Sequence, residues 1–183
     1  MIETERLILR RWKDSDRAPF HAMCNDLNVM QFLGPRLSRE QSDAAIDRQN
    51  ALQDSIGHCF WAVERKQDGA FIGFCGLKPG PAGTPIEGEV EIGWRLAREA
   101  WGHGYAAEAA QASLDWAWAN LDVPSVAAIT VPGNIRSWSL MERLGMERAE
   151  ADDFDHPAAP PHLRAHITWR IARPVHRGAS RPV

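Results

Sequence analysis

The sequence predicts a mixed α/β fold, and this prediction rests on the order of the expected elements in three successive parts of the chain. A strand and two helices come first, three strands with hairpin-like connections follow, and strands then alternate with helices to the end. A doubly wound parallel sheet would repeat strand–helix units from the start. The chain of 183 residues therefore favours a mixed sheet in one domain.

The first third of the chain predicts one strand and two helices. Apolar and polar residues alternate over 5–12, as in a half-buried strand, and a helix is expected over 17–27. The second helix spans 38–56, because Ser38 and Gln41 have the spacing of a capping box.

The middle of the chain predicts three strands. Two of them, over 58–66 and 70–77, are joined by Gln-Asp-Gly, which indicates a hairpin. A loop rich in proline and glycine, 78–88, leads to the third strand over 89–96.

The last third predicts alternating elements. A helix over 104–120 and a strand over 125–131 precede a helix over 134–145, which ends at Gly145 as helices commonly do. The stretch Met-Glu-Arg-Ala-Glu-Ala and the segment 163–173 are expected to form two closing strands.

Composition narrows the function classes. The net charge is −3 and basic residues are scattered, so no nucleic-acid partner is expected. No apolar run approaches the ~20 residues of a membrane span, so no membrane association is expected. Cys24, Cys59 and Cys75 form no disulfide framework, which favours a reducing cytoplasm. We expect one domain over 1–173 and a flexible tail over 174–183.

The stretch Trp-Gly-His-Gly-Tyr-Ala, 101–106, combines two glycines with the start of a helix. Such a loop is either a plain turn or a phosphate site, because helix N-terminal amides favour anions. A dinucleotide fingerprint needs a third glycine where Ala107 stands, and a Walker motif needs Gly-Lys-Ser/Thr, which is absent. A nucleotide-binding Rossmann domain stays as a weaker alternative.

Four stretches in order resemble the GNAT superfamily of N-acetyltransferases, and in particular its Rim-type branch. They are TERLILRRWKDSD, EVEIGWRLAREAWGHGYAAEAAQASLDWAW, PGNIRSWSLMERLGM and FDHPAAPPHLRAHITWRI. The resemblance covers residues 1 to about 173. It implies the GNAT fold: a mostly antiparallel, twisted sheet of about seven strands, splayed at the coenzyme A site and flanked by about four helices.

The resemblance also implies how acetyl-CoA, the co-substrate, would be held. Backbone amides of the glycine loop would hold the diphosphate, backbone groups of the preceding strand would pair with the pantetheine, and Asn134 would bind it or cap its own helix. The loop begins with Trp101 where the family more often has Gln or Arg. The expected coenzyme-binding residues are Trp94, Leu96, Trp101, Gly102, His103, Gly104, Tyr105, Ala106 and Asn134.

Acetyl transfer to an amine requires a base for the amine and a proton for the departing thiolate. Glu91 matches a glutamate of the Rim-type branch and is expected to be the base, with Glu89 on the same strand face as a weaker candidate. Ser137 matches a serine placed near the thiol and would relay a proton or bind the sulfur. Met141 stands where many family members have a tyrosine, and it cannot donate a proton.

The resulting hypothesis is a monomeric or homodimeric N-acetyltransferase in which an amine attacks acetyl-CoA directly. The acceptor is a protein N-terminus or a small-molecule amine. The alternative is a non-catalytic acyl-CoA-binding module. Asp43 and Asp47 would favour a cationic acceptor if they lined the site, and Trp12 and Trp138 are further candidates for its wall.

No metal site is expected. His156, His162 and His166 are near the closing strands, but they lack further ligands at metal-binding spacing. The imidazole of His103 is expected to point to solvent.

Overall fold

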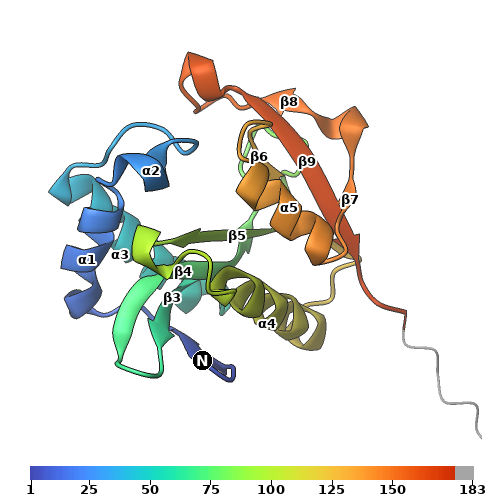
Figure 1. Cartoon of the computed structure of the whole chain (residues 1–183). Coiled ribbons are helices and arrows are strands. Elements are labelled where there is room, and N and C mark those ends of the chain that lie inside the picture. Colours follow the sequence, from blue (N-terminus) through green and yellow to red (C-terminus); the bar gives the residue numbers. More distant parts are fainter. Residues whose placement is uncertain (176–183) are drawn as a thin grey trace, which may run out of the picture.

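The structure is a computed structural model that describes residues 1–175. Over these residues nine strands form one sheet: eight follow the order β1-β2-β3-β4-β5-β6-β9-β7, and β8 pairs with β9 (Figure 1). The pairing is antiparallel except between β5 and β6. The strands are β1 (Ile2–Glu3), β2 (Leu7–Arg10), β3 (Phe60–Arg65), β4 (Ala70–Pro79), β5 (Val90–Leu96), β6 (Ser125–Thr130), β7 (Glu147–Arg148), β8 (Phe154–Asp155) and β9 (Ala165–Ala172).

The predicted mixed, mostly antiparallel sheet is confirmed, with nine strands in place of about seven. The strands that the sequence did not reveal, β1 and β8, have two residues each, too few for an alternating pattern. Most of the expected tail, residues 176–183, lies outside the described residues.

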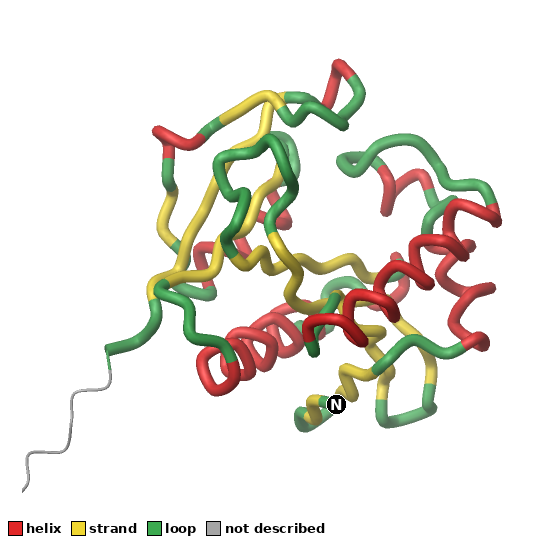
Figure 2. The backbone as a smooth tube through the Cα atoms, turned by 180° about the vertical axis from the view of Figure 1, so that it is seen from behind, coloured by secondary structure: helices red, strands yellow, loops and turns green. Residues whose placement is uncertain are grey.

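In the described part of the chain, five α-helices accompany the sheet, and the tube in Figure 2 shows them from behind. They are α1 (Arg17–Met23), α2 (Leu27–Met30), α3 (Arg39–Ile56), α4 (Tyr105–Asn120) and α5 (Ile135–Arg143). The capping box of Ser38 and Gln41 begins α3 as predicted. The single helix expected over 17–27 is wrong, because the side chain of Asp26 accepts hydrogen bonds from the amides of Asn28 and Val29 and starts α2.

The two faces of the sheet carry separate apolar cores. Cys75 of β4 lies 3.7 Å from the hydroxyl of Ser113 in α4, whereas its neighbour Phe74 packs against Phe20 of α1 with ring centroids 6.3 Å apart. Successive strand residues point to opposite faces, so α4 covers one face and α1 covers the other. In Figure 1, α1 and α2 lie on the left and α4 lies at the lower centre.

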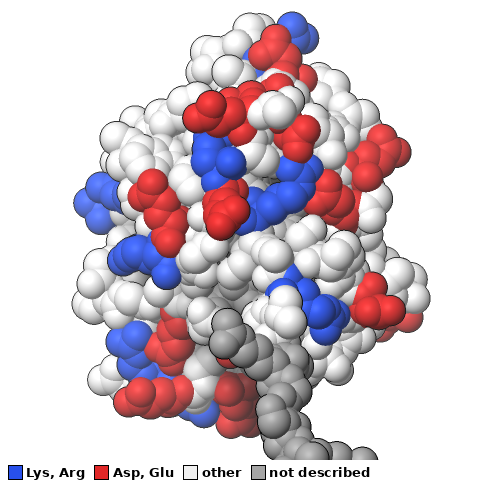
Figure 3. All heavy atoms as spheres, turned by 90° about the vertical axis from the view of Figure 1, so that its right-hand side faces the viewer, with Lys and Arg blue, Asp and Glu red and all other residues white. Residues whose placement is uncertain are grey.

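The surface mixes acidic and basic side chains (Figure 3), and none of the described helices is a candidate for a membrane span. Within residues 1–175, no helix combines the length and the apolarity that crossing a bilayer requires. On the face shown in Figure 3, acidic and basic side chains are interspersed. Arg170 pairs with both Glu89 and Asp152, and Arg148 pairs with Asp153.

Candidate functional site

The strands β5 and β6 separate in the middle of the sheet. They pair in parallel at Val90–Val126 and at Glu91–Ala127, whereas β5 continues to Leu96. Beyond Glu91, the edge of β5 that faces β6 has no strand partner within the described residues. A wedge-shaped gap therefore opens in the sheet, which confirms the predicted splay.

The register of β5 decides which backbone groups face this gap. The amide of Ala97 bonds to the carbonyl of Ile72 at 2.9 Å, in line with the antiparallel pairing of β4 and β5. Such bonds alternate along a strand, so the backbone groups of Trp94 and Leu96 point away from β4 and toward the gap. One of them has a partner, because the indole Nε1 of Trp101 donates to the Leu96 carbonyl at 2.9 Å.

The glycine loop lies at one end of the gap, directly before α4. Gly102 and Gly104 both have a φ of +80°, a conformation that suits glycine, and Gly104 is the N-cap residue of α4. No side chain caps this helix, so its first amides are free for a ligand. Tyr105 and Ala106 line the cleft, whereas the ring of His103 stacks on Tyr105 and is not part of the lining.

Residues at the N-terminus of the chain hold the glycine loop in place. Arg6 donates from Nη1 to the carbonyl of His103 at 2.9 Å and from Nε to Glu108 of α4 at 2.6 Å. Thr4 also donates to Glu108. Burial opposes ionisation of Glu108, but these hydrogen bonds outweigh it and hold its pKa below the usual value. Sequence reasoning missed this clamp, because its members are about 100 residues apart.

The helix α5 forms the opposite side of the gap. Asn134 is the N-cap residue of α5, but within the described residues its side chain makes no capping hydrogen bond; its amide group donates to the hydroxyl of Thr130 at 3.1 Å. Ser137 lines the cleft, half-buried, one turn farther along. Met141 is fully buried in the core and has no access to the cleft.

Trp101 connects the two sides of the gap. Two guanidinium groups lie over its ring, that of Arg98 at 4.8 Å and that of Arg136 in α5 at 4.7 Å. The resemblance to the Rim-type branch allows an aromatic residue at this position. The structure shows that this ring lines the cleft with two cations close to it.

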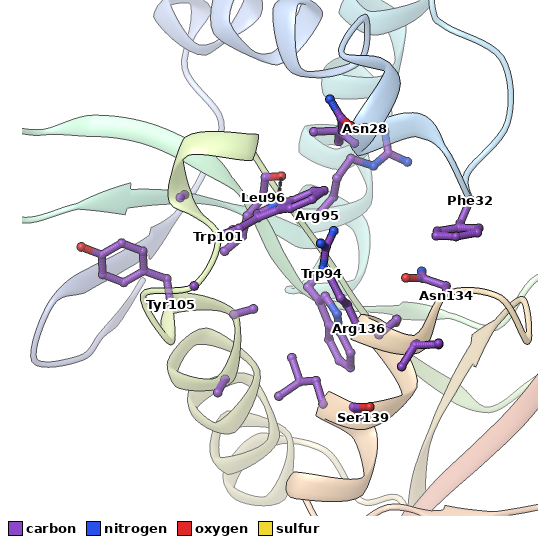
Figure 4. Close-up of a pocket in the computed structure, with 18 of the residues that line it drawn as sticks. Asn28, Phe32, Trp94, Arg95, Leu96, Trp101, Tyr105, Asn134, Arg136 and Ser139 are labelled. Carbon is purple, nitrogen blue, oxygen red and sulfur yellow. Dashed lines mark hydrogen bonds between the residues drawn. The ribbon is translucent and has the colours of Figure 1, made fainter.

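These elements enclose a cleft of about 930 Å³ (Figure 4). We call its two sides the glycine wall, formed by residues 100–102, 104–107, 133–137, 139, 140 and 143, and the α2 wall, formed by residues 28, 29 and 31–33 together with Arg95. Trp94 and Leu96 lie between them. In Figure 4, Arg95 extends toward Asn28, whereas Arg136 reaches toward Trp101.

The two candidate carboxylates have different surroundings. Glu91 is 8% exposed, lies at the closed end of the gap and pairs with Lys78 at 2.8 Å. Burial raises the pKa of Glu91 above its usual value, although Lys78 opposes the shift. The side chain is not part of the cleft lining. Glu89 lies before β5 and forms a bidentate pair with Arg170.

Asp43 and Asp47, which would favour a cationic acceptor if they lined the site, are not part of the lining of this cleft. They form ion pairs with Arg17 of α1, and Asp43 also pairs with Arg39. Helical spacing alone could not show which way they point.

The two tryptophans offered for the acceptor wall do not line this cleft. Trp12 is buried against Phe20 and Phe71 and donates to the carbonyl of Phe60, and Trp138 donates to the carbonyl of Pro132.

Over residues 1–175, no group of three or more His, Cys, Asp and Glu side chains is placed to hold a metal ion.

Comparisons with known proteins agree with this geometry. The family described as "Acetyltransferase (GNAT) domain" matches residues 6–147. The chain is 34% identical to the uncharacterized protein YkkB of Bacillus subtilis, over 79% of this chain and 84% of that protein. An acetyltransferase structure from Agrobacterium tumefaciens is 28% identical, with a TM-score of 0.76 over 93% of this chain and 92% of the other.

A more distant structure shares the fold alone. The spermidine N-acetyltransferase of Vibrio cholerae, solved in complex with CoA and spermine, is 18% identical. Its TM-score is 0.71, over 93% of this chain and 97% of that one.

Proposed function

Because this chain belongs to the acetyltransferase (GNAT) domain family, we propose that it moves an acetyl group from acetyl-CoA to a primary amine by direct attack in a ternary complex. The observation that carries the proposal is the free edge of β5 between the glycine loop and α5. The motifs of the sequence favour the Rim-type branch. The three cysteines are free and buried, which favours a reducing compartment such as the cytoplasm.

The backbone hydrogen-bonding groups of the cleft match those of acetyl-CoA. The amides of residues 102–106 at the α4 N-terminus suit a diphosphate, because the positive end of the helix dipole adds to the hydrogen bonds. The backbone groups of Trp94 and Leu96 suit the amides of the pantetheine, in the manner of an added strand. When bound, acetyl-CoA supplies the thioester carbonyl that the amine attacks.

Glu91 receives the amine proton in this proposal. Its raised pKa makes it a stronger base than an exposed glutamate, and its position outside the lining favours transfer through a water molecule. Lys78 holds the carboxylate in place. Ser137 donates a hydrogen bond to the departing sulfur, because Met141 offers no proton. Positioning of the two reactants supplies much of the rate.

Steady-state kinetics with a panel of amines test the proposal. Free thiol should appear in proportion to acetylated amine, and double-reciprocal plots should intersect, as a ternary complex requires. Parallel lines would indicate an acetyl-enzyme intermediate and would exclude direct attack.

The buried Met141 and the Glu91–Lys78 ion pair favour one alternative, a non-catalytic acyl-CoA-binding module. This module would bind acetyl-CoA in calorimetry without thiol release for any amine in the panel. Turnover with one amine would exclude it.

A further inference from the structure

Arg95 is a cation that has no acidic partner among residues 1–175. Over residues 1–175, its polar neighbour is the thiol of Cys24, 3.5 Å from Nη1, and no carboxylate contributes to its electrostatic surroundings. Its guanidinium lies over the ring of Phe74 at 5.3 Å. The Nε atom is buried and has no hydrogen-bond partner in the described part of the chain. A buried charge left in this state is unfavourable unless a ligand pairs with it.

Arg95 separates two cavities. It lines the 930 Å³ cleft and also a second cavity of about 260 Å³, and it is the residue that both share. The second cavity has aromatic walls that include Trp12, Phe20, Phe60 and Phe74. In Figure 4, Arg95 extends from β5 to the α2 side of the cleft, away from α5. Its side chain is therefore directed away from the glycine wall, where the coenzyme is proposed to bind.

The described charges around both cavities have one sign. The charged residues of the larger lining are Arg95, Arg136 and Arg143, and those of the smaller are Arg48 and Arg95. Asn28 and Gln31 add neutral amide groups beside Arg95 in the larger cleft. A polycationic acceptor would be repelled here, whereas an anionic group would gain a charge-assisted hydrogen bond.

The distance between Glu91 and Arg95 along β5 indicates how far apart the amine and the anionic group of the acceptor should be. Glu91 and Arg95 are four residues apart on the same face of one strand, so their Cα atoms are roughly 13 Å apart. Gly93, between them, has no side chain, and the ring of Phe60 packs against it there. An acceptor that reaches Arg95 with one end and places its other end near Glu91 needs an anionic group at the first end and an amine at the second.

We propose that Arg95 binds the carboxylate of the acceptor, so that the preferred acceptors are small amines with a carboxylate at the far end of an apolar body. This inference rests on the proposed acetyltransferase function and specifies its substrate class. It disfavours polyamines, and it disfavours peptide N-termini that lack a nearby acidic residue.

Three amines with the same aromatic body test the inference: 4-(aminomethyl)benzoate, benzylamine and 1,4-bis(aminomethyl)benzene. We expect kcat/KM, referred to the neutral amine, to be on the order of 10- to 100-fold higher for the carboxylate than for benzylamine, and lowest for the diamine. The variant R95Q should abolish this ratio, and R95K should restore part of it. R39Q is the matched control, because Arg39 is an exposed arginine of α3 outside both cavities.

Peptide arms distinguish the source of the carboxylate. Ala-Asp-Ala and Ala-Asn-Ala differ in one acidic group, and both should be poorer acceptors than 4-(aminomethyl)benzoate. Preferential use of Ala-Asp-Ala would assign the site to acidic peptides and overturn the small-molecule class. Equal use of the three aromatic amines, or a ratio unchanged in R95Q, would overturn the role of Arg95.

Binding measurements separate this inference from the proposed function. If no amine releases thiol, the acetyltransferase proposal fails. In that case, calorimetry with 4-(aminomethyl)benzoate and benzylamine, at saturating CoA, still tests Arg95. Weaker binding of the carboxylate to R95Q than to wild type and R39Q, with thermal melts confirming that all three fold, would support the site. Equal or undetectable binding would overturn it.

Discussion

The two walls of the cleft are built in different ways. The glycine wall presents backbone groups: helix N-terminal amides behind Gly102 and Gly104, beside the free edge of β5. The α2 wall presents side chains, above all Arg95, on elements that approach from distant parts of the sequence. A backbone surface suits a ligand that never changes, whereas a side-chain surface can be altered one residue at a time. We therefore expect the constant substrate at the glycine wall and the acceptor at the α2 wall.

The largest expected effect lies at the closed end, where both substrates would meet. E91Q should lower kcat by about 10²- to 10⁴-fold, the range of general-base contributions. In wild type, kcat/KM should rise with pH as Glu91 ionises at its raised pKa, and this part of the profile should vanish in E91Q. E89Q is the control, because Glu89 pairs with Arg170 instead. An unchanged pH profile in E91Q would refute its role as the base.

The next prediction tests whether the glycine wall acts through its backbone. G104A should weaken binding of CoA by about tenfold, because a residue with a side chain loses roughly 1–2 kcal/mol in the left-handed region. G145A has a matching φ of +81° after α5 and no atom within 4 Å of the added Cβ. It should lower the melting temperature similarly but leave the dissociation constant of CoA unchanged. Equal affinity in the two variants would argue against a backbone cradle.

The sequence was informative about the glycine wall for a physical reason. Its parts are consecutive in the chain, so strand, glycine loop and helix can be recognised from local patterns such as Gly102-x-Gly104. The α2 wall depends on tertiary packing. Contacts between elements decide the direction of the Arg95 side chain, and they also decide that Asp43 and Asp47 pair with Arg17. The break between α1 and α2 at Asp26 was missed because the capping signal lies within an otherwise helical stretch.

A smaller effect is expected where a side chain of the glycine wall would assist chemistry. S137A should lower kcat by roughly five- to tenfold, in line with the loss of one hydrogen bond to the departing sulfur. The affinity for CoA should change little, since the bond forms as the thiolate leaves. S55A removes an exposed helix hydroxyl from α3 and serves as the control. A drop in CoA affinity with unchanged kcat would assign Ser137 to binding instead.

The smallest expected effect concerns the support behind the glycine wall. Glu108 has a lowered pKa in the folded chain, so the stability that its hydrogen bonds with Thr4 and Arg6 contribute is present above its unfolded pKa of about 4.3. That stability is lost as the pH falls through the lowered folded value. E108Q should therefore destabilise the fold by ~1 kcal/mol at pH 7 and flatten the acid side of the stability profile.

E142Q, on the exposed side of α5, is the control. It should change neither the stability at pH 7 nor the acid side of the stability profile. Urea melts from pH 3 to pH 7 would measure the difference. Because Arg6 also donates to the carbonyl of His103, E108Q should weaken CoA binding slightly as well. If E108Q lowers stability but leaves CoA affinity intact, the glycine wall keeps its shape without the hydrogen bonds of Glu108. CoA binding would then depend on the backbone of this wall alone.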